Sequence, residues 1–376
     1  MIKNEEHVIN RCLSSIEGVV DAYSIVDTGS TDSTLDKCEE FLSTHIGQLS
    51  KHEWKNFGHN RTQSFLSTRE YVRDVLKWDL NSTYGLLIDA DIVFVNKNLR
   101  DITLTKPGYS VYHINGNTRY TVTKIISMAT DWKSVGVTHE YWSGGEVELL
   151  DSNVCYMQER ADSISRLKNE KFIRDKHLLE DGLRSEPDNS RYMFYLANTY
   201  RALNMYTDAI AMYEKRIEAG GWDEELWYCY YSIGVIYRWL YDDIQFEEHM
   251  LKAYSLNPRR AEPIFHLAHY FGHKKQLYKS QYYCDMGKKI PPNLTDTLFI
   301  EEHLYGQVFG IIEKELICPW VSQEVFLPVY DYERQSTLPE NMEDGSQSNL
   351  YLSQSSDSDS SAEPRTQTSS CVHLPM

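Results

Sequence analysis

A repeat in the second half of the chain constrains the fold more than any other sequence feature. Three small residues, Ala197, Gly234 and Ala268, are 37 and 34 positions apart, and each is followed three positions later by Tyr or Phe. A small residue paired with an aromatic one, at a period of about 34, is typical of stacked helical hairpins, which jointly bury a core that no single hairpin could bury. The loop Gly220-Gly221-Trp222 accounts for the longer first spacing. We therefore predict an all-α repeat domain over residues 159–325.

The first half of the chain has a different pattern, in which short apolar runs alternate with amphipathic segments. One apolar run, residues 22–26, ends at Asp27, and another, residues 84–88, ends at Asp89. Strands that alternate with helices predict a parallel sheet with helices on both faces. Ligands of such sheets bind at the carboxyl ends of the strands, where both aspartates fall. We predict a Rossmann-like α/β domain over residues 1–158.

The end of the chain differs from both halves. Residues 326–376 are rich in Ser, Asp and Gln and poor in apolar side chains. Such a segment cannot offset its conformational entropy by burial, so we predict a disordered acidic tail.

Charge and cysteine usage limit the partners and the compartment. The net charge of −17 would repel nucleic acid and anionic membranes over most of the surface, so we expect neither as a partner. The chain has no run of 18 apolar residues, and its first residues lack the apolar core of a signal peptide. Its seven cysteines are scattered and form no C-x-x-C pair, which favours reduced thiols. We expect a cytoplasmic protein without a membrane span.

Two carboxylates follow the second predicted strand. Asp89 and Asp91 flank one alanine, so both can be presented at one edge of the sheet. Carboxylates are suitable ligands for Mn²⁺ or Mg²⁺, and such a cation would neutralise the charge of a leaving nucleoside diphosphate. The alternative is an acidic loop that caps the following segment.

A glycine-containing turn follows the first predicted strand. Asp27 is followed by Thr-Gly-Ser-Thr-Asp at positions 28–32. A carboxylate at a strand end can accept the imide N–H of a uracil base, while Gly29 permits a tight turn and Ser30 can cap the next helix. The alternative is an ordinary turn between a strand and a helix.

Together these motifs resemble family 2 glycosyltransferases, in the family's order, over residues 1 to about 145. The resemblance rests on Lys-Asn-Glu-Glu at 3–6, Arg-Cys-Leu-Ser-Ser at 11–15, Ile-Val-Asp-Thr-Gly-Ser-Thr-Asp-Ser-Thr at 25–34, Trp-Lys-Asn-Phe at 54–57, Asn-Arg at 60–61, Leu-Ile-Asp-Ala-Asp at 87–91 and Val-Gly-Val-Thr-His-Glu at 135–140. The last element is similar to one in members that also carry tetratricopeptide repeats, which the helical half resembles.

The resemblance implies a GT-A fold and an inverting transfer of a hexose from a nucleotide diphosphate sugar, with a UDP-sugar as the usual donor. It implies nucleotide-binding roles for Asn4, Glu5, Asp27, Gly29, Ser30, Arg61 and Asp89. Asp91 would be the direct metal ligand, with Asp89 and His139 as further candidates. An inverting transfer also needs a base for the acceptor hydroxyl, for which Glu140 is the first candidate and Asp131 the alternative, while His139 could orient the diphosphate.

Several of these residues have a plainer interpretation. Arg61 could be a helix-surface arginine paired with a carboxylate. His139 and Glu140 could simply end a strand. The nearby aromatic residues could form a platform for the acceptor or could belong to the core, namely Trp132, Tyr141 and Trp142.

The chain departs from the family at its first strand. Family members have several apolar residues before the Lys-Asn-Glu-Glu element, whereas only Met1 and Ile2 precede it here. We expect a first strand too short to pair with the full length of its neighbour, whose backbone stays partly unpaired.

Three functions compete at this stage. The first is a metal-dependent transferase acting on a protein or glycan acceptor, whose repeat groove holds a peptide partner. The second is a non-catalytic tetratricopeptide-repeat scaffold with a degenerate transferase domain. The third is a nucleotidyltransferase, which would need a phosphate-gripping loop, and the sequence contains no P-loop pattern.

Overall fold

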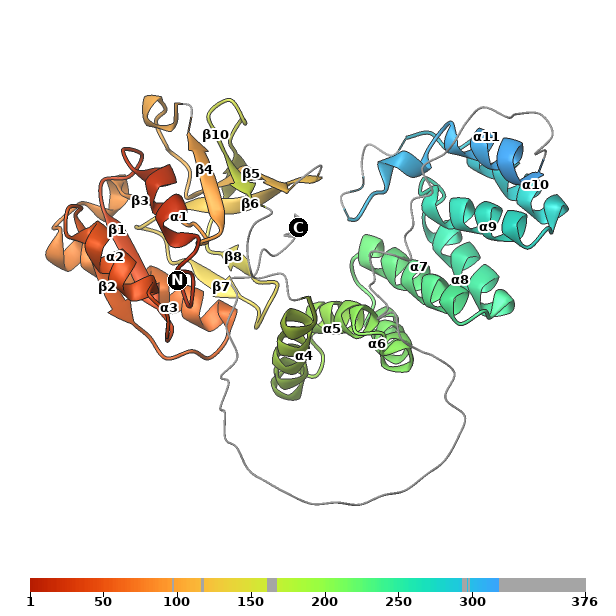
Figure 1. Ribbon diagram of the computed structural model, residues 1–376, viewed down its shortest axis with the longest axis horizontal. Helices are drawn as coiled ribbons and strands as arrows, with labels where there is room; N and C mark the ends of the chain where they lie inside the picture. The colour runs from red at the N-terminus through yellow and green to blue at the C-terminus, as the bar shows by residue number, and fades with distance from the viewer. Residues whose placement is uncertain (97, 116–117, 161–167, 293–295, 297, 318–376) are drawn as a thin grey trace, which may run out of the picture.

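The chain folds into a strand-rich first half and an all-helical second half (Figure 1). A computed structural model describes residues 1–96, 98–115, 118–160, 168–292, 296 and 298–317. The last strand of the first half is β10 (Cys155–Glu159), and the helical half begins with α4 (Lys168–Ser185). The predicted acidic tail, residues 326–376, lies outside the described residues.

A small parallel sheet begins the first half. Strand β1 (Tyr23–Asp27) pairs in parallel with β2 (Gly47–Lys51), and α2 (Thr34–Leu42) makes the crossover between them. Parallel strands need such a crossover, so this part of the chain follows the predicted strand–helix–strand pattern.

The other edge of β1 is paired only at its end. The backbone N–H of Ile2 donates to Val26 O at 2.7 Å, and Thr28 N–H donates to Ile2 O at 2.9 Å. These bonds form a single parallel bridge between Ile2 and Asp27. A first strand too short to pair fully is therefore confirmed.

The larger sheet is mixed rather than parallel. Its strand order is β3-β6-β5-β10-β4, with β9 beside β5. Pairing is antiparallel between β3 and β6, β6 and β5, and β10 and β4, whereas β5 pairs in parallel with β10 and β9. The strands not yet given bounds are β3 (Tyr84–Leu86), β4 (Ile92–Asn96), β5 (Gly108–Asn115), β6 (Thr118–Ser127) and β9 (Val147–Leu149).

The predicted parallel sheet is therefore limited to β1 and β2, and the prediction is wrong for β3, which belongs to the mixed sheet. β6 begins three positions after β5 ends, and strands joined by so short a connection can only pair antiparallel. β3 then joins the free edge of β6 instead of β1.

Two helices pack against these sheets. The spacing of Ile9, Leu13 and Ile16 places them on the buried face of α1 (Ile9–Ile16), which contacts β4. Helix α3 (Phe57–Glu70) continues through a π-helical turn, Tyr71–Val75, and contacts the hairpin of β7 (Lys133–Val135) and β8 (Tyr141–Ser143). Through α3, the beginning of the chain reaches the region of the His139–Glu140 motif.

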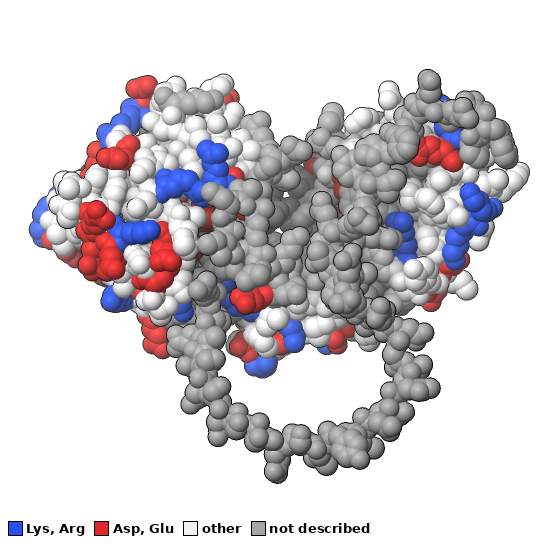
Figure 2. All heavy atoms as spheres, in the orientation of Figure 1, with Lys and Arg blue, Asp and Glu red and all other residues white. Residues whose placement is uncertain are grey.

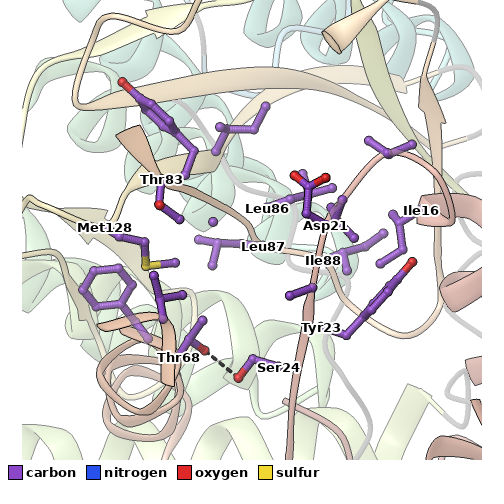
Figure 3. A pocket seen from close by; sticks show the side chains of 18 of the residues that line it. Ile16, Asp21, Tyr23, Ser24, Thr68, Thr83, Leu86, Leu87, Ile88 and Met128 are labelled. Carbon is purple, nitrogen blue, oxygen red and sulfur yellow. Dashed lines mark hydrogen bonds between the residues drawn. The ribbon is translucent and has the colours of Figure 1, made fainter. Parts of the chain in front are cut away.

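A cavity of about 750 Å³ lies between the two sheets. In Figure 3, Leu86, Leu87 and Ile88 face Tyr23 and Ser24 across it. The hydroxyl of Thr68, on α3, donates to Ser24 Oγ at 2.8 Å at one side of the cavity. The space lies along the edge of β1 that the single Ile2 bridge leaves unextended.

Charged side chains are mixed over the surface seen in Figure 2, and acidic ones gather around α2. No helix within the described ranges combines the length and apolar character needed to cross a bilayer.

The second half consists of helical hairpins in the predicted register. The helices are α5 (Ser190–Ala202), α6 (Tyr206–Glu218), α7 (Asp223–Trp239), α8 (Asp243–Leu256), α9 (Glu262–His273) and α10 (Leu277–Gly287). Within each pair, the turn contains one residue in the left-handed region: Asn204 (φ 58°), Tyr241 (φ 59°) and Lys275 (φ 60°). These turn residues are again 37 and 34 positions apart. The helical-repeat prediction is confirmed.

Small residues let the two helices of a hairpin approach closely. A Cβ added to Gly234 would lie 3.1 Å from Cε of Met250 on α8, and both Ala197 and Ala268 are fully buried. Figure 1 shows α4 to α11 (Val308–Ile312) arranged as an arc, with α4 against the first hairpin and α11 against the last. The α4 end of this arc lies near the hairpin β7–β8, so the repeats adjoin the first half at that end.

The cavity predicts unequal costs for two similar truncations. We expect Ile25→Ala, which enlarges an existing cavity, to lower the free energy of unfolding by about 2 kcal/mol. Ile92→Ala removes a fully buried side chain from the mixed sheet and should cost about 4 kcal/mol. Urea unfolding of both variants measures the difference, and equal costs would contradict it.

Candidate functional site

The predicted nucleotide-binding residues near the N-terminus form one cluster of turns. Asp27, at the end of β1, is almost fully buried, and its carboxylate accepts the N–H groups of Gly29 at 2.9 Å and Ser30 at 3.1 Å. Gly29 has φ 107°, a conformation that favours glycine. The turn before α2 is therefore closed by the carboxylate that precedes it.

The segment before α1 closes the same cluster. Asn4 N–H donates to Ser30 Oγ at 2.9 Å, and Asn4 Oδ1 accepts Thr31 N–H at 2.8 Å. Glu5 N–H donates to the hydroxyl of Thr34 at 2.7 Å. The structure thus brings together all five N-terminal residues that the sequence proposed for nucleotide binding.

A second cluster, the ionic cluster, surrounds Asp89. Its Oδ1 lies 2.8 Å from Nη2 of Arg61, on α3, and its Oδ2 lies 2.7 Å from Nζ of Lys124, on β6. Burial alone would raise the pKa of Asp89, but the two cations together hold that pKa well below its usual value. Asp89 is therefore ionised, and each of its oxygens has a cationic partner.

Arg61 joins this aspartate to the third motif. Its Nε lies 2.5 Å from Oε1 of Glu140, which is only 2% exposed. The second oxygen of Glu140, Oε2, is buried without a hydrogen-bond partner among the described residues. Glu140 and Asp89 therefore lie on the same guanidinium, although 51 positions separate them in the chain.

Asp91 carries the least compensated carboxyl group of the site. It is 1% exposed, and neither of its oxygens has a hydrogen-bond partner within the described part of the chain. Burial and, to a smaller extent, the nearby carboxylates of Asp89, Glu5 and Glu159 together raise the pKa of Asp91 to about 8. Such a carboxyl is protonated at neutral pH unless a cation is bound beside it.

The N-terminus lies between the two clusters. Burial and the charge of Arg61 lower the pKa of the Met1 amino group to about 6, against the opposing effect of Asp89. The next residue, Ile2, bonds to the strand that ends at Asp27. Met1 and Ile2 thus connect the turn cluster to the ionic cluster.

Two predicted site residues, His139 and Asp131, have contacts outside the ionic cluster. The ring of His139 stacks on Tyr195 of α5, with the ring centroids 4.1 Å apart. Asp131 is highly exposed and pairs with Arg69 at 2.5 Å. Arg69 follows Arg61 by eight positions on α3, or about 12 Å along a helix, so the structure does not bring Asp131 to the ionic cluster.

The described side chains do not by themselves provide enough ligands for a metal ion. In the described ranges, no three His, Cys, Asp or Glu side chains form a group that could hold a metal ion. The unpaired oxygens of Asp91 fit a hard cation such as Mn²⁺ or Mg²⁺, whereas the oxygens of Asp89 are both engaged. A cation would need further ligands from substrate or solvent.

Lys124 is the residue that sequence reasoning missed. It is 7% exposed on β6, between Thr123 and Ile125. A lysine next to the apolar residues Ile125 and Ile126 of a strand is unusual, because a buried ammonium needs a partner, and this was the available signal. The partner itself, Asp89, could not be named because it lies 35 positions earlier, in the segment between β3 and β4.

Comparison with known proteins identifies no family for the chain. No protein-family model matches it, and no curated protein matches it. The solved structures that resemble it are similar to its helical half.

Three of these structures illustrate the similarity. YrrB, described as a TPR protein with an unusual peptide-binding site, is 18% identical over 32% of this chain and 60% of YrrB, with a TM-score of 0.27. MamA is 18% identical over 42% of this chain and 88% of MamA, with a TM-score of 0.31. PilF of Pseudomonas aeruginosa is 13% identical over 38% of this chain and 60% of PilF, with a TM-score of 0.30. At such scores the helical-repeat assignment rests on the chain's own hairpins.

The raised pKa of Asp91 predicts a pH dependence in metal-free buffer. The folded state holds a proton up to about pH 8, whereas the unfolded state loses it near pH 3.8, so stability falls as pH rises between these values. Asp91→Asn should remove this slope and make the protein more stable than wild type at pH 8.5, by a few kcal/mol at about 1.4 kcal/mol per pKa unit. Urea unfolding in EDTA at pH 5, 6.5 and 8.5 measures it.

The matched control is Asp131→Asn, which removes an exposed carboxylate and should leave the slope unchanged. Parallel stability curves for wild type and Asp91→Asn would show that the carboxyl of Asp91 is ionised in the folded state.

The ionic cluster predicts a second stability effect. Lys124→Met leaves Asp89 with one cation and should lower the free energy of unfolding by about 3 kcal/mol. Adding Asp89→Asn removes the undercompensated charge and should restore much of that loss. Lys106→Met, at an exposed pair with Glu146, serves as the control and should cause no measurable change. A Lys124→Met variant as stable as wild type would contradict the assignment.

Proposed function

We propose that the first half is an inverting glycosyltransferase of the GT-A type that uses a nucleotide diphosphate sugar and a divalent cation. The observation that supports it most is Asp91, whose carboxyl is buried and unpaired beside the ionised Asp89. Proteins seldom bury a polar group without a partner, and a functional site is a common reason for the exceptions. The order of the family 2 motifs, together with their meeting in space, supports the same conclusion.

The residues of the chain would then take the following roles. The turn cluster around Asp27 would receive the base and ribose of a UDP-sugar, at the carboxyl end of β1. Asp91, together with ligands from the substrate or solvent, would hold Mn²⁺ or Mg²⁺, which would supply charge neutralisation at the diphosphate, and Asp89 would join it only by giving up one of its ion pairs. Arg61 and Lys124 would keep Asp89 ionised and offer further positive charge to the phosphates.

Glu140 would act as the base for the acceptor hydroxyl. Its oxygen Oε1 lies 2.5 Å from Nε of Arg61. Because Glu140 is buried, the acceptor would have to enter between this carboxylate and the donor, which requires the ion pair to open. When the donor binds, Arg61 would release the carboxylate of Glu140 and pair with a phosphate of the donor instead.

A second candidate function is a non-catalytic helical-repeat scaffold. The observation in its favour is that Asp89 has both oxygens satisfied by Arg61 and Lys124, as in a structural ion-pair network. Helical repeats of this kind present extended surfaces for peptides. In either case we propose a peptide or protein partner for the arc of α5 to α10.

Calorimetric titration separates the two candidates. We expect wild type to bind UDP in the presence of Mn²⁺ and to bind it at least tenfold more weakly in EDTA. Asp91→Ala should abolish the part of the affinity that depends on the metal. Hydrolysis of a panel of sugar nucleotides, including UDP-sugars, then tests turnover and identifies the sugar.

Asp131→Ala is the matched control, because it removes a carboxylate outside the ionic cluster, and it should bind UDP as wild type does. No binding of uridine, guanosine or thymidine diphosphate by wild type, with Mn²⁺ present, would refute the transferase and favour the scaffold. Metal-dependent binding that survives Asp91→Ala would refute the assignment of the ligand.

A further inference from the structure

The loop that carries Glu140 is held from two sides. It joins β7 to β8 and spans residues 136–140. On one side, the first amides of α3 donate to its backbone: Phe57 N–H to Val137 O at 3.1 Å, and Gly58 N–H to Gly136 O at 3.0 Å. Since α3 also carries Arg61, this side of the loop is fixed to the ionic cluster.

The helical half holds the other side through α5. Arg191 donates from Nη2 to the carbonyl oxygen of His139 at 2.7 Å and from Nε at 3.3 Å. Its guanidinium lies 4.9 Å from the ring centroid of Tyr195 and 5.1 Å from that of Tyr141. Tyr195 in turn stacks on the ring of His139. One arginine thus contacts the residues on both sides of Glu140.

The held residue has an unfavourable backbone conformation. His139 has φ 50°, in the left-handed region, which costs a residue with a side chain about 1–2 kcal/mol. Such a conformation persists only where the surroundings enforce it. The preceding Thr138 is buried, and its hydroxyl donates to Asp175, on α4, at 3.4 Å. The contacts from α4 and α5 therefore supply the enforcement.

We propose that Arg191 is a positioning residue: by gripping the carbonyl of His139 it holds Glu140 against Arg61 and couples the helical half to the site. The catalytic consequence rests on the proposed transferase function, whereas the grip on the loop does not. Because α5 belongs to the first hairpin of the repeats, a peptide bound along the arc that displaces α5 changes the position of Glu140.

Arg191→Lys tests the proposal in the full chain. Lysine keeps the charge, but it has neither the paired donors nor the planar group that lies between the two tyrosine rings. We expect hydrogen exchange of the amides in residues 136–141 to become about tenfold faster, with α9 and α10 unchanged. We also expect kcat for sugar-nucleotide hydrolysis to fall about tenfold, while the Kd for UDP with Mn²⁺ stays within twofold of wild type.

Arg184→Lys is the matched control, because Arg184 pairs with Asp181 on the exposed side of α4, and it should change neither measurement. Unchanged exchange in residues 136–141 would overturn the proposal. Loss of UDP affinity in parallel with kcat would overturn the positioning role, because it would indicate a general loss of structure. If wild type binds no nucleotide, the proposed function fails, and the exchange result alone decides whether Arg191 holds the loop.

Discussion

One guanidinium group links the separate parts of the candidate site. Arg61 pairs with Asp89, in the segment between β3 and β4, and with Glu140, in a loop held by the helical half. Burying these charges is tolerable only because they compensate one another, with Lys124 as the second cation. The positions of the segment between β3 and β4, of α3 and of the loop therefore depend on each other, and a shift in one exposes an unpaired charge in another.

Charge compensation differs between Asp89 and Asp91, the two aspartates that we propose as metal ligands. Both oxygens of Asp89 have cationic partners, whereas neither side-chain oxygen of Asp91 has a hydrogen-bond partner within the described residues, and nearby carboxylates raise the pKa of Asp91. A divalent cation near Asp91, together with a diphosphate near Arg61, would even out this imbalance, because each incoming charge meets its opposite. An unpaired buried carboxyl group at Asp91 would not stabilise a purely structural ion-pair network. For this reason we favour the transferase over the scaffold.

Much of the fold could be predicted from local sequence patterns, and the remainder depended on distant contacts. The period of Ala197, Gly234 and Ala268 predicted the hairpins, because the small residue acts within its own hairpin. The pairing of β3 could not be predicted, because its neighbour β6 lies about 40 positions further along the chain. Likewise, the sequence suggested Arg61 and Glu140, but their contact, and the grip of Arg191 on His139, required the two halves together.

The sheet pairings have a consequence for the order of folding. β10 pairs with β4, about 60 positions earlier, and Ile2 pairs with the end of β1, so the first half forms through contacts between distant segments. The hairpins of the second half are made from neighbouring helices. Topologies with distant contacts fold more slowly than those with local ones. During synthesis the first half leaves the ribosome earlier, but α4 and α5 can fold before the sheets of the first half have finished folding. These two helices would then provide the surface against which the loop of Glu140 packs last.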